Sequence, residues 1–218
     1  MENGLQVHWL YLAFALLMLW YPRHLLRLGK WRSKKRRHRE ALEKFAQDGA
    51  NDPDDKSVKL RRELAKPRNH LDYLRGFAGA AALWSFSFTA VGPDAHTAMF
   101  WLCVAASTVA FIIQTTRFRA RITFFAAIFF AVGLSIGMGN YFSGAMAFLL
   151  TCAINPVIPT PRMFLTVYAL LLLPFNWLLG GGGELALVNS GILLLPPLFS
   201  LLAKRPMVIF TRKRNLTW

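Results

Sequence analysis

Hydrophobic residues gather in seven long blocks along the chain. Polar segments separate the blocks, and the longest of these follows the first block. Each block approaches or reaches the roughly 20 residues that an α-helix needs to cross the ~30 Å hydrocarbon core of a membrane. The pattern therefore predicts an all-α, polytopic helical membrane protein with about seven transmembrane helices. The expected helices are Val7–Tyr21, Gly76–Val91, Thr97–Gln114, Ile122–Gly139, Tyr141–Ile158, Met163–Leu179 and Leu185–Ala203.

The polar segments divide the chain into four expected regions. These are a first transmembrane helix (1–24), a basic loop (25–75), a six-helix transmembrane bundle (76–203) and a basic tail (204–218). Apolar spacing within the loop predicts two short amphipathic helices, which would form a helical hairpin. The first is expected at Arg39–Gln47, and the second begins at Asp55 or Ser57 and runs through Ala65, where Pro67 ends it.

The distribution of charge predicts how these helices are oriented. The chain carries 26 Lys and Arg residues and a net charge of +15. If the N-terminus lies outside, the cytoplasmic segments are 22–75, 115–121, 159–162 and 204–218, and they contain every Lys and Arg. The charged residues on the opposite face are then only Glu2, Asp94 and Glu184. Positive residues stay on the cytoplasmic side during insertion. We therefore expect a multi-pass protein of the cell (inner or plasma) membrane with a cytoplasmic C-terminus.

The densest basic run follows the first predicted helix. Cytoplasmic anionic lipid attracts juxtamembrane basic residues by about 1 kcal/mol each. Binding of RNA or DNA would need base-stacking aromatic residues among the charges, and the loop offers only Trp31 and Phe45. We therefore predict contact with anionic headgroups or with a protein partner, and no binding of nucleic acid. The residues expected to make this contact are Lys30, Trp31, Arg32, Lys34, Lys35, Arg36, Arg37 and Arg39.

The predicted helices offer few groups for chemistry. Ionisable residues are costly inside a membrane and usually mark ion or proton pathways, and none lies at mid-depth here. Two cysteines within apolar blocks and no Cys/His cluster predict no metal site, and we expect no cofactor. Whether His8, His24, His70 or His96, at the helix ends, binds a pigment or haem is left open. We expect the amides Asn155, Asn176 and Asn189 to form interhelical hydrogen bonds.

Glycine spacing predicts where helices approach each other closely. The stretch Gly133–Gly137, "GLSIG", formally matches the nucleophile elbow of serine hydrolases, but that motif needs a strand–turn–helix context. Inside an apolar helix, the same residues form a Gly-x-x-x-Gly packing face. Gly76 and Gly79 are expected to allow a similar contact.

The stretch "RNHLDYLRGFAG" (Arg68–Gly79) resembles the start of the first helix in acyltransferase-3-like membrane proteins, which often begins with an L-D-x-L-R-G phrase. The resemblance covers about a dozen residues and implies a membrane-bound acyltransferase-like enzyme. The family helix tends to continue to a histidine, whereas Leu83–Phe88 contains none. A physical reading of the same residues is that Asp72 and Arg75 form an ion pair near the helix start.

These observations favour a non-enzymatic integral membrane subunit or scaffold whose partners are lipid and other membrane protein subunits. The 18 Phe and 7 Trp residues and the basic loop suit such a role. Proline breaks at Ile154–Pro161, Pro174 and Pro196–Pro197 leave open a small transporter for a neutral or lipid-like substrate, since freed carbonyls can line a cavity. The acyltransferase-like enzyme is a further alternative.

Overall fold

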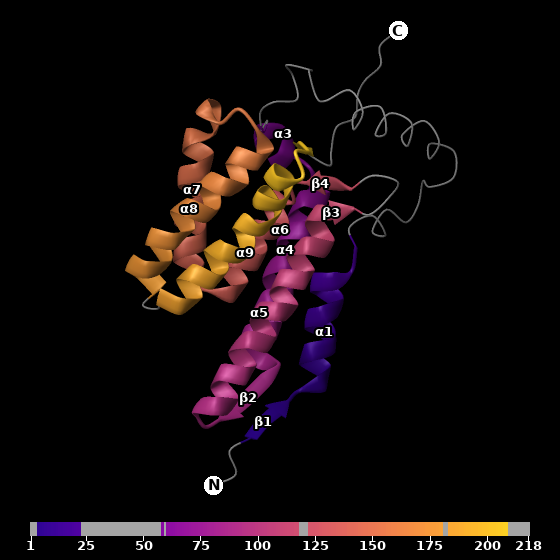
Figure 1. Cartoon of the computed structure of the whole chain (residues 1–218), viewed down its shortest axis with the longest axis vertical. Coiled ribbons are helices and arrows are strands. Elements are labelled where there is room, and N and C mark those ends of the chain that lie inside the picture. Colours follow the sequence, from indigo (N-terminus) through magenta and orange to yellow (C-terminus); the bar gives the residue numbers. More distant parts are fainter. Residues whose placement is uncertain (1–3, 23–57, 59, 118–121, 181–182, 209–218) are drawn as a thin grey trace, which may run out of the picture.

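The computed structural model describes residues 4–22, 58, 60–117, 122–180 and 183–208, and 79% of these residues are helical. Figure 1 shows a helical bundle with small strand pairs near its two ends. The helices are α1 (Trp9–Trp20), α3 (Leu60–Leu64), α4 (Pro67–Ala81), the π-helix η2 (Ala82–Phe86), α5 (Pro93–Thr115), α6 (Ile128–Met138), α7 (Tyr141–Ile154), the 3-10 helix η3 (Asn155–Val157), α8 (Pro161–Gly180) and α9 (Gly183–Leu202). The strands are β1 (Gly4–Val7), β2 (Phe88–Val91), β3 (Thr116–Arg117), β4 (Thr123–Phe125) and β5 (Met207–Val208).

The strands tie together helix ends that are distant in sequence. At one end, β1 pairs antiparallel with β2, so the start of α1 lies beside the start of α5. At the other end, β4 pairs antiparallel with β3 and parallel with β5, which gathers the end of α5, the start of α6 and the end of α9. Successive long helices consequently run in alternating directions between the lower and upper ends of Figure 1.

Three helices in the described part of the chain are long and apolar enough to cross a membrane: α5, α8 and α9. The apolar helices α1, α6 and α7 with η3 are shorter. The expected span Ile122–Gly139 is a shorter helix because residues 123–125 form β4, whose neighbour Ala126 donates its backbone N–H to the Val208 carbonyl at 3.0 Å. The prediction of a mostly helical chain is confirmed at this coarser level.

The second expected span, Gly76–Val91, was wrong in its bounds and its content. Helix α4 begins at Pro67, and the apolar block divides into the end of α4, the π-helix η2 and the strand β2. Pairing with β1 favours the extended backbone after η2, and the Ser87 hydroxyl donates to the Ala82 carbonyl at 2.8 Å. The expected loop boundary at residue 75 therefore falls inside α4.

Helix α3 (Leu60–Leu64) falls within the second amphipathic helix expected of the loop, whose expected start at Asp55 or Ser57 lies outside the described residues. Proline lacks the N–H that would be unsatisfied at a helix start, so Pro67 suits the first position of α4 as well as the end of the preceding helix. Val58, which precedes α3 and falls within the expected second helix, is buried. The first amphipathic helix, Arg39–Gln47, lies outside the described residues.

Helices α4 and α6 form the centre of the core, and glycines let their backbones approach. A Cβ on Gly76 would lie 2.6 Å from the Phe130 carbonyl oxygen, and one on Gly137 would lie 2.6 Å from the Phe77 carbonyl oxygen. A Cβ on Gly133 would overlap the Tyr73 carbonyl. Gly79 faces α1 instead, where its Cβ would lie 2.7 Å from the Leu19 Cγ. Three of the four predicted packing glycines thus meet at one crossing.

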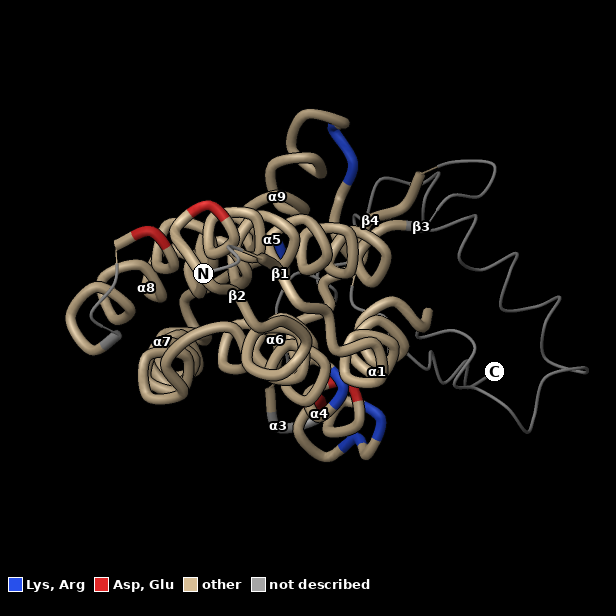
Figure 2. Tube along the Cα trace, turned by 90° about the horizontal axis from the view of Figure 1, so that it is seen from below, with Lys and Arg blue, Asp and Glu red and all other residues tan. Residues whose placement is uncertain are grey.

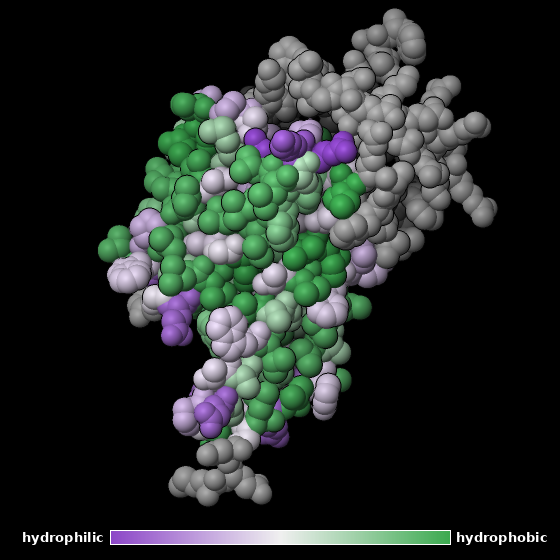
Figure 3. Space-filling model, viewed as in Figure 1, coloured by the Kyte–Doolittle hydropathy of each residue, from purple (hydrophilic) through white to green (hydrophobic). Residues whose placement is uncertain are grey.

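The outer surface of the bundle is strongly apolar between its two ends. Figure 3 shows a hydrophobic surface with hydrophilic residues gathered towards the top and the bottom of the visible face. Figure 2 shows Lys, Arg, Asp and Glu at helix ends and around α4, with uncharged helix between them. Large exposed apolar side chains include Trp9, Leu10, Leu17, Trp101, Leu102, Leu149, Leu170, Trp177, Leu187 and Leu198. These residues belong to α1, α5, α7, α8 and α9, so the apolar surface extends over much of the bundle.

Candidate functional site

A buried charged group lies where α4 meets the end of α1, and we call it the Arg75 centre (Asp72, Arg75, Gln114 and the carbonyls of Met18 to Tyr21). Arg75 is 5% exposed and Asp72 3% exposed. The Arg75 guanidinium contacts the Asp72 carboxylate at 3.4 Å. Its Nε and Nη2 atoms donate to the Met18 carbonyl at 3.2 and 3.1 Å, and Nη2 also donates to the Tyr21 carbonyl.

Gln114 reaches the same helix end from α5. Its Nε2 atom donates to the Leu19 and Tyr21 carbonyls, both at 2.9 Å. The last carbonyls of a helix lack intrahelical donors and carry partial negative charge, so a cation and an amide are suitable caps. The charged pair of the L-D-Y-L-R-G phrase therefore holds α1 against α4, and Gln114 holds α1 against α5. The signal for Gln114 in the sequence is that it is an isolated amide at the end of an otherwise apolar block.

A second polar group joins α3 to the start of α4. The Lys66 ammonium lies 2.5 Å from the Glu63 carboxylate, and Asn69 donates to the Glu63 backbone carbonyl at 2.8 Å and to its carboxylate at 2.9 Å. Burial lowers the pKa of the Arg68 guanidinium below its ordinary value, while the negative charges of Glu63 and Asp72 act in the opposite direction. These contacts stabilise the α3–α4 corner.

Two carboxamides lie beside the break between α6 and α7, and we call this group the amide centre (Ser135, Gly139, Asn176 and Asn189). Asn189 on α9 donates from Nδ2 to the Ser135 carbonyl of α6 at 3.0 Å, which is the interhelical hydrogen bond expected of it. Asn176 on α8 was expected to make a similar bond, and its side chain makes none with the described residues. The exposed fractions of Asn176, Asn189 and Ser190 are 4%, 0% and 3%.

Among the described residues, no hydrogen-bond partner is found for Asn176 Nδ2 and Asn189 Oδ1 of the amide centre, nor for Ser190 Oγ next to Asn189 in the sequence. Gly139 lies between the two carboxamides. A Cβ on Gly139 would have the Asn189 Nδ2 at 3.4 Å, the Asn176 Oδ1 at 3.5 Å and the Ser135 carbonyl oxygen at 3.6 Å as its nearest neighbours. The space beside the bare Gly139 Cα is thus bordered by three polar atoms.

Hydrogen bonds around this space fix the four helices that surround it. The Ser135 hydroxyl lies 2.5 Å from the Tyr168 hydroxyl, and it also donates to the Val132 carbonyl at 2.9 Å. Ser143 of α7 donates to the Phe175 carbonyl at 3.0 Å, and Asn140 donates to the Leu179 carbonyl at 2.8 Å. Ser135 is therefore placed in a helix beside a tyrosine, a setting unlike that of a serine nucleophile, which needs a neighbouring base.

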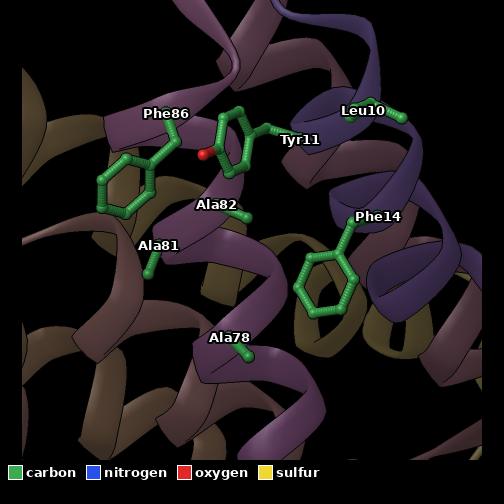
Figure 4. Close-up of a pocket in the computed structure, with 7 residues that line it drawn as sticks. All are labelled: Leu10, Tyr11, Phe14, Ala78, Ala81, Ala82 and Phe86. Carbon is green, nitrogen blue, oxygen red and sulfur yellow. The ribbon is translucent and has the colours of Figure 1, made fainter.

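An apolar groove of about 420 Å³ runs between α1 and the α4–η2 segment. Figure 4 shows the Tyr11 and Phe86 rings at one end, Phe14 near the other end, and alanines between them. The Tyr11 and Phe86 ring centroids are 5.8 Å apart. The lining residues are Leu10, Tyr11, Phe14, Ala78, Ala81, Ala82 and Phe86. The alanine side chains are small and leave this space between the helices. Within the same stretch of α4, Gly79 is in close contact with Leu19 of α1.

The predicted contact residues Lys30, Trp31, Arg32, Lys34, Lys35, Arg36, Arg37 and Arg39 lie outside the described residues, as does His24. His8 forms a 2.8 Å hydrogen bond with the Thr89 hydroxyl across the β1–β2 pair, and His70 lies 2.6 Å from the Leu64 carbonyl. His96 lies near the start of α5. Within the described ranges, no group of three or more His, Cys, Asp or Glu residues is placed to hold a metal ion.

No family model matches the chain, and no curated protein or solved structure matches it either. The resemblance to acyltransferase-3-like proteins therefore rests on the phrase at Arg68–Gly79 alone. In the structure, the Arg75 side chain of this phrase is engaged with backbone carbonyls of α1. The features of the molecule that bear on its function are therefore its own surface, its groove and its two buried polar centres.

Proposed function

We propose that the protein is a multi-pass protein of the cell membrane that acts as a non-enzymatic subunit or scaffold of a membrane assembly. The observation that carries this proposal is the broad apolar surface between two charged helix ends (Figure 3). Contiguous exposed apolar surface of this extent is typical of contact with lipid or with a protein partner. In this proposal, the ends of α4, α8 and α9 that lie at or next to Lys66, Arg162 and Lys204 face the cytoplasm. Asp94 and Glu184 lie on the opposite side of the membrane.

Photo-crosslinking from the exposed surface tests the role as a subunit. A photoreactive amino acid in place of Trp101, which is 59% exposed on α5, should form adducts with other membrane proteins in intact membranes. The same amino acid in place of Phe111, which is buried on the same helix, is the matched control and should form none. Adducts with lipid alone at Trp101, and at equivalent positions on α7 and α9, would count against a protein assembly.

The basic run supplies the second contact in this proposal, with anionic headgroups. Replacing Lys34, Lys35, Arg36 and Arg37 by Gln should weaken binding of a peptide of residues 25–57 to anionic vesicles. At about 1 kcal/mol for each charge, the loss approaches ~4 kcal/mol, and it should shrink as salt screens charges beyond ~8–10 Å. A peptide that ignores anionic vesicles yet binds RNA at physiological salt would overturn this assignment.

A carrier for a lipid-like substrate is the second candidate, and the groove between α1 and α4 favours it. An acyl chain is thin and apolar, so it can lie along the groove, whose lining is made of aliphatic and aromatic side chains. We propose an acyl chain as the occupant.

Filling the groove tests the carrier. Ala81→Phe should reduce the lipid that co-purifies with the protein, measured by mass spectrometry after gentle solubilisation. Ala105→Phe, at an exposed position on α5, is the matched control and should leave the bound lipid unchanged. Equal lipid retention by both variants would remove the groove from the account, and a tightly bound membrane protein in its place would favour the subunit role alone.

A further inference from the structure

We propose that the groove between α1 and the α4–η2 segment holds one acyl chain of a zwitterionic phospholipid of the outer leaflet, with the phosphate bound at the Tyr11 end. This inference rests on the carrier proposed above as the second candidate function. It adds the leaflet, the direction of the chain and the residues that bind the headgroup. These residues are His8, Tyr11 and Thr89, and we call them the mouth of the groove.

The groove occupies only part of the membrane thickness. Its lining residues on α1, which are Leu10, Tyr11 and Phe14, belong to the first half of that twelve-residue helix. The start of α1 follows β1, at the end of the bundle that lies outside in the proposed orientation. The opposite wall runs from Ala78 to Phe86, which at ~1.5 Å per residue is at most roughly 12 Å. Since the hydrocarbon core is ~30 Å thick, a groove of this length at this end lies within the outer leaflet.

One wall of the groove is an unusual backbone segment. The lining residues Ala82 and Phe86 are the first and last residues of the π-helix η2. π-Helices are rare, and short ones occur frequently at functional sites. The Ser87 hydroxyl donates to the Ala82 carbonyl at 2.8 Å, and the Trp84 indole donates to the Ser107 hydroxyl of α5 at 3.1 Å. These contacts hold the segment in place, which distinguishes the groove from the remaining apolar surface.

Polar side chains gather at one end of the groove. The Tyr11 and Phe86 ring centroids are 5.8 Å apart at this end, and Figure 4 shows the Tyr11 hydroxyl pointing towards Phe86. The His8 ring centroid lies 6.5 Å from that of Tyr11, and His8 Nε2 lies 2.8 Å from the Thr89 hydroxyl oxygen. The lining at the other end is apolar. The groove is therefore suited to an amphiphile whose polar group lies at the mouth, the level at which tyrosine commonly meets lipid headgroups.

The charges at this end of the bundle select the kind of headgroup. Two hydroxyls and an imidazole can each donate a hydrogen bond, and phosphate oxygens accept them. In the proposed orientation, the outer face has the carboxylate of Asp94 at the start of α5 and no Lys or Arg. A headgroup with a net negative charge would meet no strong counter-ion there. A zwitterionic headgroup brings an ammonium group of its own, so a zwitterionic phospholipid fits best.

Photoreactive lipids in membranes that contain the full chain test the direction of the acyl chain. Two phosphatidylethanolamine probes carry a diazirine, one beside the ester and one halfway along the acyl chain. The first should label Tyr11 and Phe86, and the second should label Phe14 and Ala78. The reverse pattern would overturn the proposal. Labelling no stronger than on the exposed faces of α8 and α9 would indicate ordinary surrounding lipid, and it would overturn the proposal as well.

Tyr11→Phe and Thr89→Val test the phosphate contact, because each removes one hydroxyl and keeps the shape of the side chain. Each should reduce labelling by phosphatidylethanolamine roughly three- to tenfold, the effect of losing one hydrogen bond. Labelling by a diacylglycerol with the same diazirine, which lacks the phosphate, should not change. Tyr141→Phe is the matched control, since Tyr141 is an exposed tyrosine beside Phe142 on α7, which does not line the groove. It should change labelling by neither lipid.

Ala81→Phe, which fills the groove, separates this inference from the carrier on which it rests. The expected result is that Ala81→Phe lowers labelling by both lipids, whereas the mouth variants lower labelling by phosphatidylethanolamine alone. If Ala81→Phe lowers both and the mouth variants change neither, the groove takes an acyl chain and the phosphate site at the mouth is wrong. If Ala81→Phe also leaves labelling unchanged, the carrier and this inference fail together.

Discussion

The Arg75 centre and the amide centre are both buried polar groups at helix ends, yet they differ in how their hydrogen bonds are used. At the Arg75 centre, Nε, Nη1 and Nη2 of a single arginine all have partners, and Gln114 serves two carbonyls of the same helix end. At the amide centre, one carboxamide atom of Asn176 and one of Asn189 have no partner in the described part of the chain. The side chains of the Arg75 centre thus bind backbone carbonyls of α1, whereas the carboxamides of the amide centre are only partly bonded within the protein.

This difference separates charged residues whose contacts stabilise the fold from neutral residues whose contacts are incomplete. Charges are the groups that usually suggest function inside a membrane protein. Here Arg75 caps α1 and joins it to α4, and Gln114 joins α1 to α5, which accounts for the burial of these side chains in structural terms. The unpartnered amides would pass as ordinary packing in the sequence, and they are the ones that the structure leaves unexplained.

The largest expected effect comes from removing the cation of the Arg75 centre. Arg75→Leu leaves the Asp72 carboxylate buried without its cation and the α1 carbonyls without their donor. Breaking one side of a buried pair costs about 3–5 kcal/mol of unfolding free energy. Unfolding in detergent should show this loss, and Arg75→Lys should recover only part of it, because the three donors of an ammonium all lie on one nitrogen and cannot reach acceptors that are spread around Nε, Nη1 and Nη2 of a planar guanidinium.

Arg162→Gln is the matched control for this prediction, since Arg162 is half-buried at the start of α8 and away from α1. It should change stability by less than about 1 kcal/mol. An Arg75→Leu protein as stable as the Arg162→Gln protein would show that the charged site is not structural, and the comparison between the two centres would fail.

The next effect concerns the α4–α6 crossing, which connects the two centres. Gly76 is adjacent to Arg75, and Gly133 lies on the helix that carries Ser135. Gly76→Ala places a methyl 2.6 Å from the Phe130 carbonyl oxygen, so the helices must separate, at a cost of about 1–3 kcal/mol. The loss of stability should exceed that of Gly4→Ala, where nothing lies within 4 Å of the added carbon. Equal stabilities would mean that this crossing is looser than the structure has it.

A smaller effect is expected at Gln114. Gln114→Leu removes two hydrogen bonds to α1 carbonyls, each worth about 0.5–1.5 kcal/mol. Because Gln114 and Arg75 share the Tyr21 carbonyl, the double variant with Arg75→Leu should lose less than the sum of the two single losses. Strictly additive losses would show that the two residues cap α1 independently.

The smallest effect is expected at the β1–β2 pair. His8 and Thr89 are linked by an exposed hydrogen bond across the two strands. His8→Ala should lower the free energy of unfolding by less than about 1 kcal/mol, because water replaces an exposed partner at little cost. A loss comparable to that of Arg75→Leu would show that this strand pair, rather than the charged site, holds α1 in place.

The sequence predicted the helical character of the chain but not several features that depend on distant residues. Apolar blocks give helices, and the bounds of α8 and α9 fall within two residues of the expected spans. The strand β2 depends on pairing with β1, more than 80 residues earlier, so the block Gly76–Val91 alone carried no sign of it. The shortening of α6 likewise depends on pairing of β4 with β3 and β5.

The candidate sites were less accessible to sequence reasoning because backbone atoms form much of them. The Asp72–Arg75 ion pair was expected from its spacing on one helix face and is present at 3.4 Å. The remaining partners of Arg75 are carbonyls of α1, which no side-chain pattern reveals. The amide centre assembles Gly139, Asn176 and Asn189 from three separate helices, and a single sequence gives no information on their distance.

The central claim is that the chain crosses a membrane with its basic ends in the cytoplasm. It is tested most directly by locating two positions relative to the membrane, the C-terminus after α9 and the connection between α8 and α9. A reporter that is active only in the cytoplasm, such as a fluorescent protein, should be active when fused after Trp218. A reporter that is active only outside, such as alkaline phosphatase, should be active when inserted between Gly181 and Gly182, which lie between α8 and α9 in the sequence. The account predicts opposite sides for these two positions. Both positions on one side, or the reverse assignment, would contradict it.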